Sequence, residues 1–358
     1  AYISDVNGED EVYIQQANET GTAKQLTKNG DTYKYAIDWS PDSKYIAWSD
    51  NKLRLFYVNV ETGNITLADQ GKTWEHNSWN WSPDSRWLAF SRSDDDRVIK
   101  IFLHNLATKE NTLVTDAWYE SHSPSFSDDG KFLLFVSDRD FNPTYSNTEW
   151  NHAYSNMSKV YMMALTKKTP SPFSPKNDEV REVTESKPED EKSNTNKPSD
   201  KTDKPKEGIN NPVDIDFDGI QGRIVSLPIS AANYWHANMV GNMVYYMHSK
   251  TGADDVTLKV YDLKERKETE VGQVSSYGLT ADNKKMLINK DSKYYIIELP
   301  KSKAELKDAV DLSAMRIFVN RKQEWNQIYN ESWRQMRDFF WDPTMHGVDW
   351  AAMRTKYQ

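Results

Sequence analysis

Four short segments are rich in aromatic side chains, three of them also carry histidine, and together they have the chemistry to hold an extended peptide. They are Tyr33-Lys-Tyr35, Trp74-Glu-His76, Trp118-Tyr-Glu-Ser-His122 and Tyr234-Trp-His236. Aromatic faces can stack on side chains of a passing chain, while carboxylate and imidazole groups can hydrogen-bond its backbone. The alternative is packing, since Trp and Tyr also fill space between small sheets. The candidate contact residues are Tyr33, Tyr35, Glu75, His76, Tyr119, Glu120, His122 and His236.

Catalysis has no comparable set of residues in this sequence. Neither a Gly-x-Ser-x-Gly elbow nor a His-Glu-x-x-His pair occurs, so a nucleophile, a base and oxyanion donors cannot be placed together. His346 is the tempting candidate, but a histidine beside a glycine just after a helix suits a structural turn. No histidine has a second ligand at metal spacing. We therefore assign no catalytic residue and expect no metal site and no cofactor.

The elements that must position the candidates are revealed by a repeated phrase of ten residues. It runs through Trp39–Trp48, Trp81–Phe90 and Phe126–Phe135, with starts 42 and 45 residues apart. This is the period at which one four-stranded sheet recurs in a β-propeller. Ser-Pro-Asp after the aromatic start favours a tight turn, and the apolar run that follows suits an inner strand buried on both faces.

Weaker copies of the repeat extend the propeller in both directions. They are Val12–Gln15 with Gly21–Thr27, then Arg223–Pro228, Met243–Met247, Lys259–Leu263 and Leu279–Ile288. We count five to six blades, complete or partial, in an all-β fold. The first copy resembles the outer half of a blade, so we expect an N-terminally truncated ring whose parent has seven blades. Because the innermost strand of a blade borders the central channel, the candidate residues are predicted to line that channel.

Composition limits the classes of partner. The chain has 358 residues, no cysteine and a formal net charge of −9, and nucleic-acid binding would need a basic face instead. No run of 18 apolar residues occurs, so no membrane span is expected. We expect a cytoplasmic protein, or a periplasmic one if a signal peptide precedes this sequence.

Two regions depart from the propeller pattern. Residues 167–211 are rich in Lys, Glu, Asp, Ser and Pro, which predicts a mobile, solvated insertion between strands of one blade rather than a lid. Aromatic residues at spacings of three and four from Trp325 to Phe340 predict a helix over Lys322–Trp341, ended before Pro343. A second short helix is expected from Val348. The boundaries are therefore a propeller over 1–318 and a helical domain over 319–358.

Both regions of regular structure carry a resemblance to a known family. The Ser-Pro-Asp-Ser phrase is similar to the blades of the TolB and tricorn group, and Val213–Pro228 is similar to a late tricorn blade. The segment from Glu324 to Trp350, with Glu331-Ser-Trp-Arg-Gln-Met-Arg-Asp-Phe-Phe-Trp-Asp-Pro, resembles the helical start of the tricorn protease core. The helical segment is the more specific of the two.

The resemblance implies a serine peptidase whose Ser, His and Glu lie outside this chain. It implies that the chain is a non-catalytic propeller, the second of two, which guides or filters peptides or unfolded polypeptide. The implied partners are the remaining core and PDZ domains of the parent protein, with assembly into a homo-oligomer left open. The alternative function is a TolB or WD-repeat-like interaction scaffold. A dipeptidyl-peptidase-like enzyme is a third, weaker alternative, because a helix rich in aromatic residues follows the propeller instead of an α/β-hydrolase.

Overall fold

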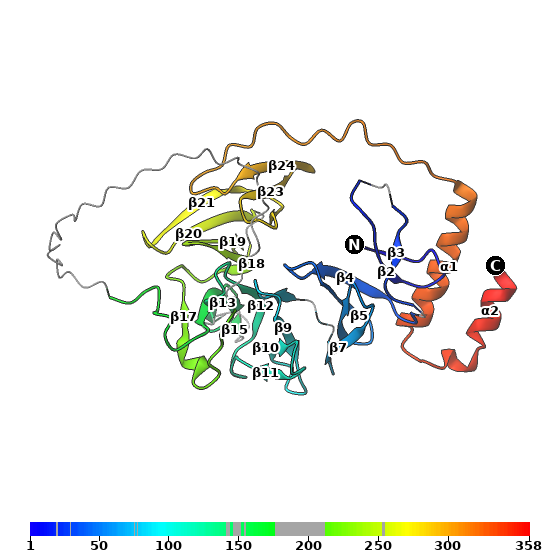
Figure 1. The fold of residues 1–358 in the computed structure, drawn as a ribbon, viewed down its shortest axis with the longest axis horizontal. Helices are drawn as coiled ribbons and strands as arrows, with labels where there is room; N and C mark the ends of the chain where they lie inside the picture. Colours follow the sequence, from blue (N-terminus) through cyan, green and yellow to red (C-terminus); the bar gives the residue numbers. More distant parts are fainter. Residues whose placement is uncertain are drawn as a thin grey trace, which may run out of the picture.

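Six small antiparallel sheets surround a common axis in the computed structural model (Figure 1). The model describes residues 1–18, 21–28, 30–74, 76, 78–140, 144–145, 152–153, 155–175, 212–252 and 255–358. The fold is a six-bladed β-propeller with a short helical segment, which confirms the predicted fold class. The seven blades of a parent ring stay a prediction.

The blades follow one another in chain order. Blade 1 consists of β1 (Tyr2–Ser4), β2 (Glu11–Ile14) and β3 (Lys24–Gln25). Blade 2 consists of β4 (Lys34–Trp39), β5 (Tyr45–Asp50), β6 (Arg54–Asn59) and β7 (Ile65–Gln70). Blade 3 consists of β8 (Trp79–Trp81), β9 (Trp87–Ser93), β10 (Ile99–Asn105) and β11 (Asn111–Leu113). Blade 4 consists of β12 (Ser121–Phe126), β13 (Phe132–Ser137), β16 (Lys159–Ala164) and β17 (Ile224–Ser226).

Blades 5 and 6 complete the series. Blade 5 consists of β18 (Asn233–Val240), β19 (Met243–Ser249), β20 (Thr257–Asp262) and β21 (Lys267–Gln273). Blade 6 consists of β22 (Ser276–Leu279), β23 (Lys285–Lys290) and β24 (Lys293–Glu298). A separate pair is formed by β14 (Thr144–Tyr145) and β15 (His152–Ala153). In the four-stranded blades the first strand along the chain lies nearest the axis, as β4, β12 and β18 show in Figure 1.

Apolar contacts between consecutive blades hold the propeller together. Five clusters of buried residues each join two neighbouring sheets, and among the described residues none joins blade 6 to blade 1. In β13, Leu133 and Phe135 belong to the cluster with blade 3, whereas Leu134 and Val136 belong to the cluster with blade 5. Both faces of an inner strand are thus buried, which explains why these strands are continuously apolar.

Each Ser-Pro-Asp turn is closed by its own hydroxyl and carboxylate. In blade 3, Ser82 Oγ donates to Asp84 Oδ1 at 2.6 Å and accepts a hydrogen bond from the Trp87 amide at 2.9 Å. The corresponding hydroxyl–carboxylate pairs are Ser40–Asp42, Ser127–Asp129 and Thr280–Asp282. The turn predicted from the sequence therefore recurs in four blades, including the degraded copy in blade 6.

The strands that flank the predicted insertion in the sequence, β16 and β17, pair with each other in blade 4. Residues 176–211 fall outside the described residues. Where the chain resumes, the Val213 amide donates to Asp84 Oδ2 at 2.7 Å, and Arg86 Nη2 donates to the Val213 carbonyl at 3.1 Å. Val213 also passes so close to Gly130 that a Cβ there would lie 2.6 Å from Val213 Cγ2. This turn therefore needs glycine for space as well as for its positive φ of 68°.

The C-terminal segment forms two helices that pack on each other. They are α1 (Arg321–Phe339) and α2 (Trp350–Tyr357), with the short 3-10 turn η2 (Met345–Gly347) between them. A second such turn, η1 (Ile220–Arg223), precedes β17. Trp333 and Trp350 stack with ring centroids 6.4 Å apart, and each indole N–H donates to the carbonyl of the other residue. The Asn320 side chain accepts hydrogen bonds from the amides of Lys322 and Gln323, which fixes where α1 begins.

The two roles of the turn carboxylate can be separated by mutation. Asp84 closes its own turn and also accepts the Val213 amide, whereas Asp282 closes only the exposed turn of blade 6. Asp84→Ala should lower the free energy of unfolding by about 2 kcal/mol, because it leaves partly buried donors unpaired. Asp282→Ala should cause a clearly smaller loss. Urea unfolding of both variants measures the difference, and equal losses would contradict the assignment.

Candidate functional site at the ring axis

A cavity of about 1140 Å³ opens at the axis, at the end where the innermost strands run into their turns. Its wall is built from five blades, 2 to 6, and from Pro212, the first described residue after the insertion. Residues that line it include Asn80, Trp81, Ser125, Phe126, Asn238, Met239, Leu279, Thr280 and Pro212. The lining mixes apolar rings and neutral hydrogen-bonding groups with charged side chains of both signs, which are Asp42, Asp84, Asp128 and Asp282 with Arg86 and Lys284.

One position of the innermost strands recurs around this cavity. It immediately precedes the aromatic start of the phrase in blades 2 to 4, and Met239 and Leu279 in blades 5 and 6. It lies opposite the third residue of the next strand's run. We call these five residues the axial row: Asp38, Asn80, Ser125, Asn238 and Gly278. Three of them, Asn80, Ser125 and Asn238, line the cavity.

Side chains of three axial-row residues join blades 3, 4, 5 and 6 in series. Asn80 Oδ1 accepts a hydrogen bond from the Phe126 amide at 2.9 Å, and Ser125 Oγ donates to Asn238 Oδ1 at 3.3 Å. Asn238 Nδ2 in turn donates to the Tyr277 hydroxyl at 2.9 Å. The axial row therefore fixes the wall of the channel while it presents amide and hydroxyl groups there.

Asp38 is the charged member of the axial row. Its side chain contacts water, yet surrounding protein atoms remove enough solvent that burial raises the pKa of Asp38 to about 6, against a lowering effect of the Trp39 amide. No neighbouring charge contributes to this pKa. Unlike Asn80, Ser125 and Asn238, Asp38 is not among the residues that line the cavity.

Two of the residues predicted from the sequence lie at the opposite end of the innermost strands. Tyr33 and Tyr35 line a second cavity of about 600 Å³, together with residues of β1 and α1. The Tyr33 ring contacts Tyr35 at a centroid distance of 5.6 Å and Phe339 of α1 at 5.7 Å. The structure thus brings these two tyrosines together beneath the helix.

His122 and His236 lie on the innermost strands of neighbouring blades, at places where the pairing register shifts. His122 is half-buried and His236 is exposed, and burial by surrounding atoms lowers the pKa of both imidazoles. His236 has a φ of 53°, and its ring lies 4.6 Å from that of Tyr277. Both histidines are therefore neutral hydrogen-bonding groups near pH 7.

The remaining predicted residues differ in their suitability for peptide contact. His76 is only 1% exposed and its Nε2 lies 2.8 Å from Asp69 Oδ2, so it serves packing between blades 2 and 3 in this conformation. Tyr119 and Glu120 are exposed on the loop before β12, and burial together with the charge of Asp138 raises the pKa of Glu120. Glu75 lies outside the described residues. Peptide contact by all eight residues stays a prediction.

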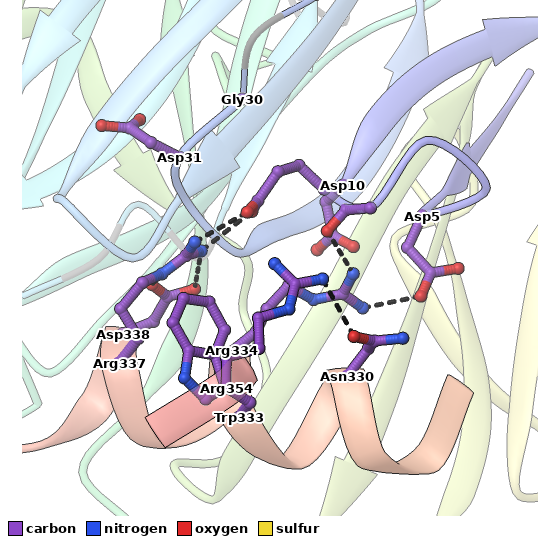
Figure 2. A network of polar contacts seen from close by, with 12 residues as sticks. Asp5, Asp10, Gly30, Asp31, Asn330, Trp333, Arg334, Arg337, Asp338 and Arg354 are labelled. Carbon is purple, nitrogen blue, oxygen red and sulfur yellow. Dashed lines mark hydrogen bonds and ion pairs between the residues drawn. The ribbon is translucent and has the colours of Figure 1, made fainter. Parts of the chain in front are cut away.

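The helical segment is held on the propeller by two arginines of α1 (Figure 2). Arg334 is 5% exposed and donates to the Gly8 carbonyl at 2.7 Å, to Asp5 Oδ2 at 2.6 Å and to Glu331. Arg337 makes a bidentate pair with Glu9, with N–O distances of 2.7 and 2.8 Å. These contacts fasten α1 to the loop between β1 and β2.

The orientation of α1 differs from what its amphipathic pattern suggests. Its polar side faces the propeller through Arg334 and Arg337, while Trp325, Ile328 and Met336 are exposed. The pattern identified the helix correctly, with an observed end at Phe339 rather than Trp341. It did not identify the docking side, because ion pairs outweigh apolar contacts at this interface.

His346 has structural surroundings. Its ring packs edge-on against Phe340 and Trp341, and its Nδ1 lies 3.4 Å from an Asp342 carboxylate oxygen. The His346 amide also donates to Asp342, so this carboxylate closes the turn between the helices. Among the described residues, no group of three or more His, Cys, Asp or Glu side chains could hold a metal ion. No helix in the described ranges is long and apolar enough to cross a membrane.

The axial row was not identified from the sequence, although a signal exists. A short polar residue precedes each aromatic start, as in Asp38-Trp39, Asn80-Trp81 and Ser125-Phe126. The aromatic residue and the turn are explained by the architecture of the blade. The short polar residue before them carries the hydrogen bonds at the axis.

Removing Arg334 should release α1 from blade 1. Arg334→Ala removes the cationic partner of the Asp5 and Glu331 carboxylates, at a cost of about 2 kcal/mol for this partly exposed cluster. Hydrogen exchange of amides in α1 should accelerate accordingly, while that of blades 3 to 5 stays unchanged. Arg321→Ala, at the exposed start of the same helix, is the matched control and should have little effect.

Acid should weaken the contact of Arg334 in α1 with the carboxylates of Asp5 and Glu331. Burial alone would raise the pKa of Asp5 and of Glu331, but hydrogen bonds and the charge of Arg334 lower both below their ordinary values of 3.8 and 4.5. Their stabilising effect is therefore complete above about pH 5 and is lost as the pH falls through the lowered values. Undocking of α1 at pH 6 would contradict this explanation.

Asp38 should have the opposite pH dependence. Because its folded pKa lies above the unfolded value of 3.8, its charged form destabilises the folded state as the pH rises through about 6. Asp38→Asn should therefore stabilise the protein at pH 8 by about 1 kcal/mol, after allowance for screening by water, and have no effect at about pH 4. Thermal unfolding at both pH values tests this, with the exposed Asp95→Asn as control.

The chain matches two models of one protein family along nearly all of its length. Residues 1–300 match the tricorn protease second β-propeller domain, and residues 321–358 match the tricorn protease C1 domain. A tricorn protease homolog from Streptomyces coelicolor is 26% identical over 381 residues, covering 100% of this chain and 34% of the relative. One from Saccharolobus solfataricus is 26% identical over 372 residues, covering 99% of this chain and 31% of the relative.

The fold agrees with these matches. The crystal structure of the tricorn protease superimposes with a TM-score of 0.81 at 19% identity, covering 100% of this chain and 34% of that structure. This chain therefore spans about a third of the length of the relatives it matches. With a propeller model over residues 1–300 and a core-domain model over residues 321–358, the chain belongs to the tricorn protease family.

Proposed function

We propose that this chain is the non-catalytic propeller portion of a tricorn-like serine protease, and that it guides or filters peptides toward an active site outside the chain. The observation that carries the proposal is the cavity of about 1140 Å³ at the axis. Its apolar rings and neutral hydrogen-bonding groups suit an extended peptide of varied sequence, since every peptide offers the same backbone groups.

The position of α1 supports a direction of passage. Its arginines bind the loop between β1 and β2, and Phe339 touches Tyr33 just before β4. Both contacts lie at the end of the blades opposite the Ser-Pro-Asp turns, because successive strands run antiparallel. A peptide would therefore enter between the turns and leave beside the helices that match the C1 domain.

The whole protein's activity follows from the same proposal. The parent would be a serine peptidase that completes its active site with further core and PDZ domains, and it would act on peptides or unfolded polypeptide. Assembly into a homo-oligomer and a cytoplasmic location belong to this proposal as predictions from the sequence.

Photocrosslinking tests whether peptides occupy the axis. Benzoylphenylalanine in place of Leu279, which lines the cavity, should form adducts with an unstructured peptide bound to the full-length protein. The same replacement of Ile65, an exposed aliphatic residue on the outermost strand of blade 2, is the control and should remain unmodified. Equal labelling at both positions, or none at Leu279, would overturn passage through the axis.

A further inference from the structure

The polar side chains that line the axial cavity differ in how far other protein groups already occupy them. Each carboxylate of the lining has a partner, either in its own turn or in a turn of the next blade. The pairs are Asp42–Ser40, Asp84–Arg86, Asp128–Gly241 and Asp282–Lys284. Both positive charges of the lining belong to these pairs, so the groups that are left for a ligand are neutral ones.

The two asparagines of the axial row are occupied to different degrees. Asn238 uses both ends of its amide, because Oδ1 accepts from Ser125 and Nδ2 donates to the Tyr277 hydroxyl. Asn80 uses one end, since Oδ1 accepts from the Phe126 amide at 2.9 Å. Among the described residues no acceptor meets Asn80 Nδ2, and this atom is in contact with solvent. A donor without a protein partner therefore lies in the wall of the cavity that Asn80 lines.

The hydrogen bond to Phe126 fixes how the Asn80 amide is oriented. A backbone N–H can only donate, so the atom that it meets is the side-chain oxygen, and the NH2 group lies on the other branch of the planar amide. This bond joins β8 to β12, the innermost strands of blades 3 and 4. Because the donor is held in place before a ligand arrives, little side-chain freedom is lost when it binds one.

A fixed, neutral N–H donor suits the carbonyl oxygen of a peptide backbone. Every residue of an extended chain presents such an oxygen, whatever its side chain. The neighbouring blade supplies the complementary group, since Ser125 donates its hydroxyl proton to Asn238 and can therefore only accept from a ligand. Asn80 and Ser125 thus offer a donor and an acceptor on adjacent blades, which are the partners that the two polar groups of a peptide unit need.

We propose that Asn80 binds the backbone of the peptide in the axial channel, with Nδ2 donating a hydrogen bond to a peptide carbonyl oxygen. This inference rests on the proposed function. It predicts that Asn80 contributes equally to the binding of peptides of different sequence, because the group it recognises is common to all of them.

Affinities of two neutral peptides of unrelated sequence, both acetylated and amidated at their ends, for the full-length protein test the inference. Asn80→Asp keeps an oxygen for the Phe126 amide but replaces the donor by an acceptor. It should weaken the binding of both peptides about five- to tenfold, as measured by fluorescence anisotropy. Asn80→Ala removes the donor without adding a charge and should weaken both by a similar factor. Thermal unfolding checks that each variant is folded.

Asn283→Asp is the matched control for the added charge. Asn283 also lines the cavity, but in the part of the chain that the structure describes no hydrogen bond holds its side-chain amide, so this change should cause a clearly smaller loss. An equal loss would attribute the effect to charge and overturn the inference. Unchanged affinity of Asn80→Asp, or a loss confined to one of the two peptides, would also overturn it.

The wild-type protein separates this inference from the proposed function. If it binds both peptides and Asn80→Asp binds them equally well, the inference fails and the proposed function stands. Absence of binding of either peptide by the wild-type protein would overturn the proposed function itself.

Discussion

A blade of this propeller can bury its two faces only by stacking on its neighbours, and the rest of the structure depends on this constraint. A sheet of three or four short strands has too little apolar surface to be stable alone. Here each shared cluster takes its residues from two blades, so that in β13 Leu134 packs toward one neighbouring blade and Leu133 packs toward the other. Stacking also places every innermost strand beside the axis.

That same stacking decides where polar chemistry can lie. Side chains on both faces of an inner strand are needed for packing, so hydrogen-bonding groups face the axis only where a strand meets its turn or changes register. Asn80, Ser125 and Asn238 lie at the first kind of position, and His236 lies at the second. The channel therefore gains its polar groups at the ends of strands rather than along them.

These physical differences explain what could be predicted from the sequence. The period of the phrase and its continuous apolar runs are direct consequences of stacking, so the propeller and its turns were predictable from residues such as Trp81 and Leu133. The burial of His76 was not, because it depends on Asp69 of the preceding blade and on Arg92 of its own blade, which no local pattern relates. Nor was the docking side of α1, since amphipathicity records which side is apolar and not which charges meet Asp5 and Glu9.

A channel that passes many peptides must bind each of them weakly, and the chemistry of the axial row suits that requirement. A neutral amide or hydroxyl exchanges a hydrogen bond with water for one with the peptide, at a net gain of about 1 kcal/mol. Many charged groups of one sign in the wall would hold an oppositely charged peptide too firmly and repel others. Here neutral groups from three blades lie beside charged groups of both signs, which are Asp42, Asp84, Asp128 and Asp282 with Arg86 and Lys284. On the proposed function, selectivity at the axis is therefore limited by the need to release the peptide.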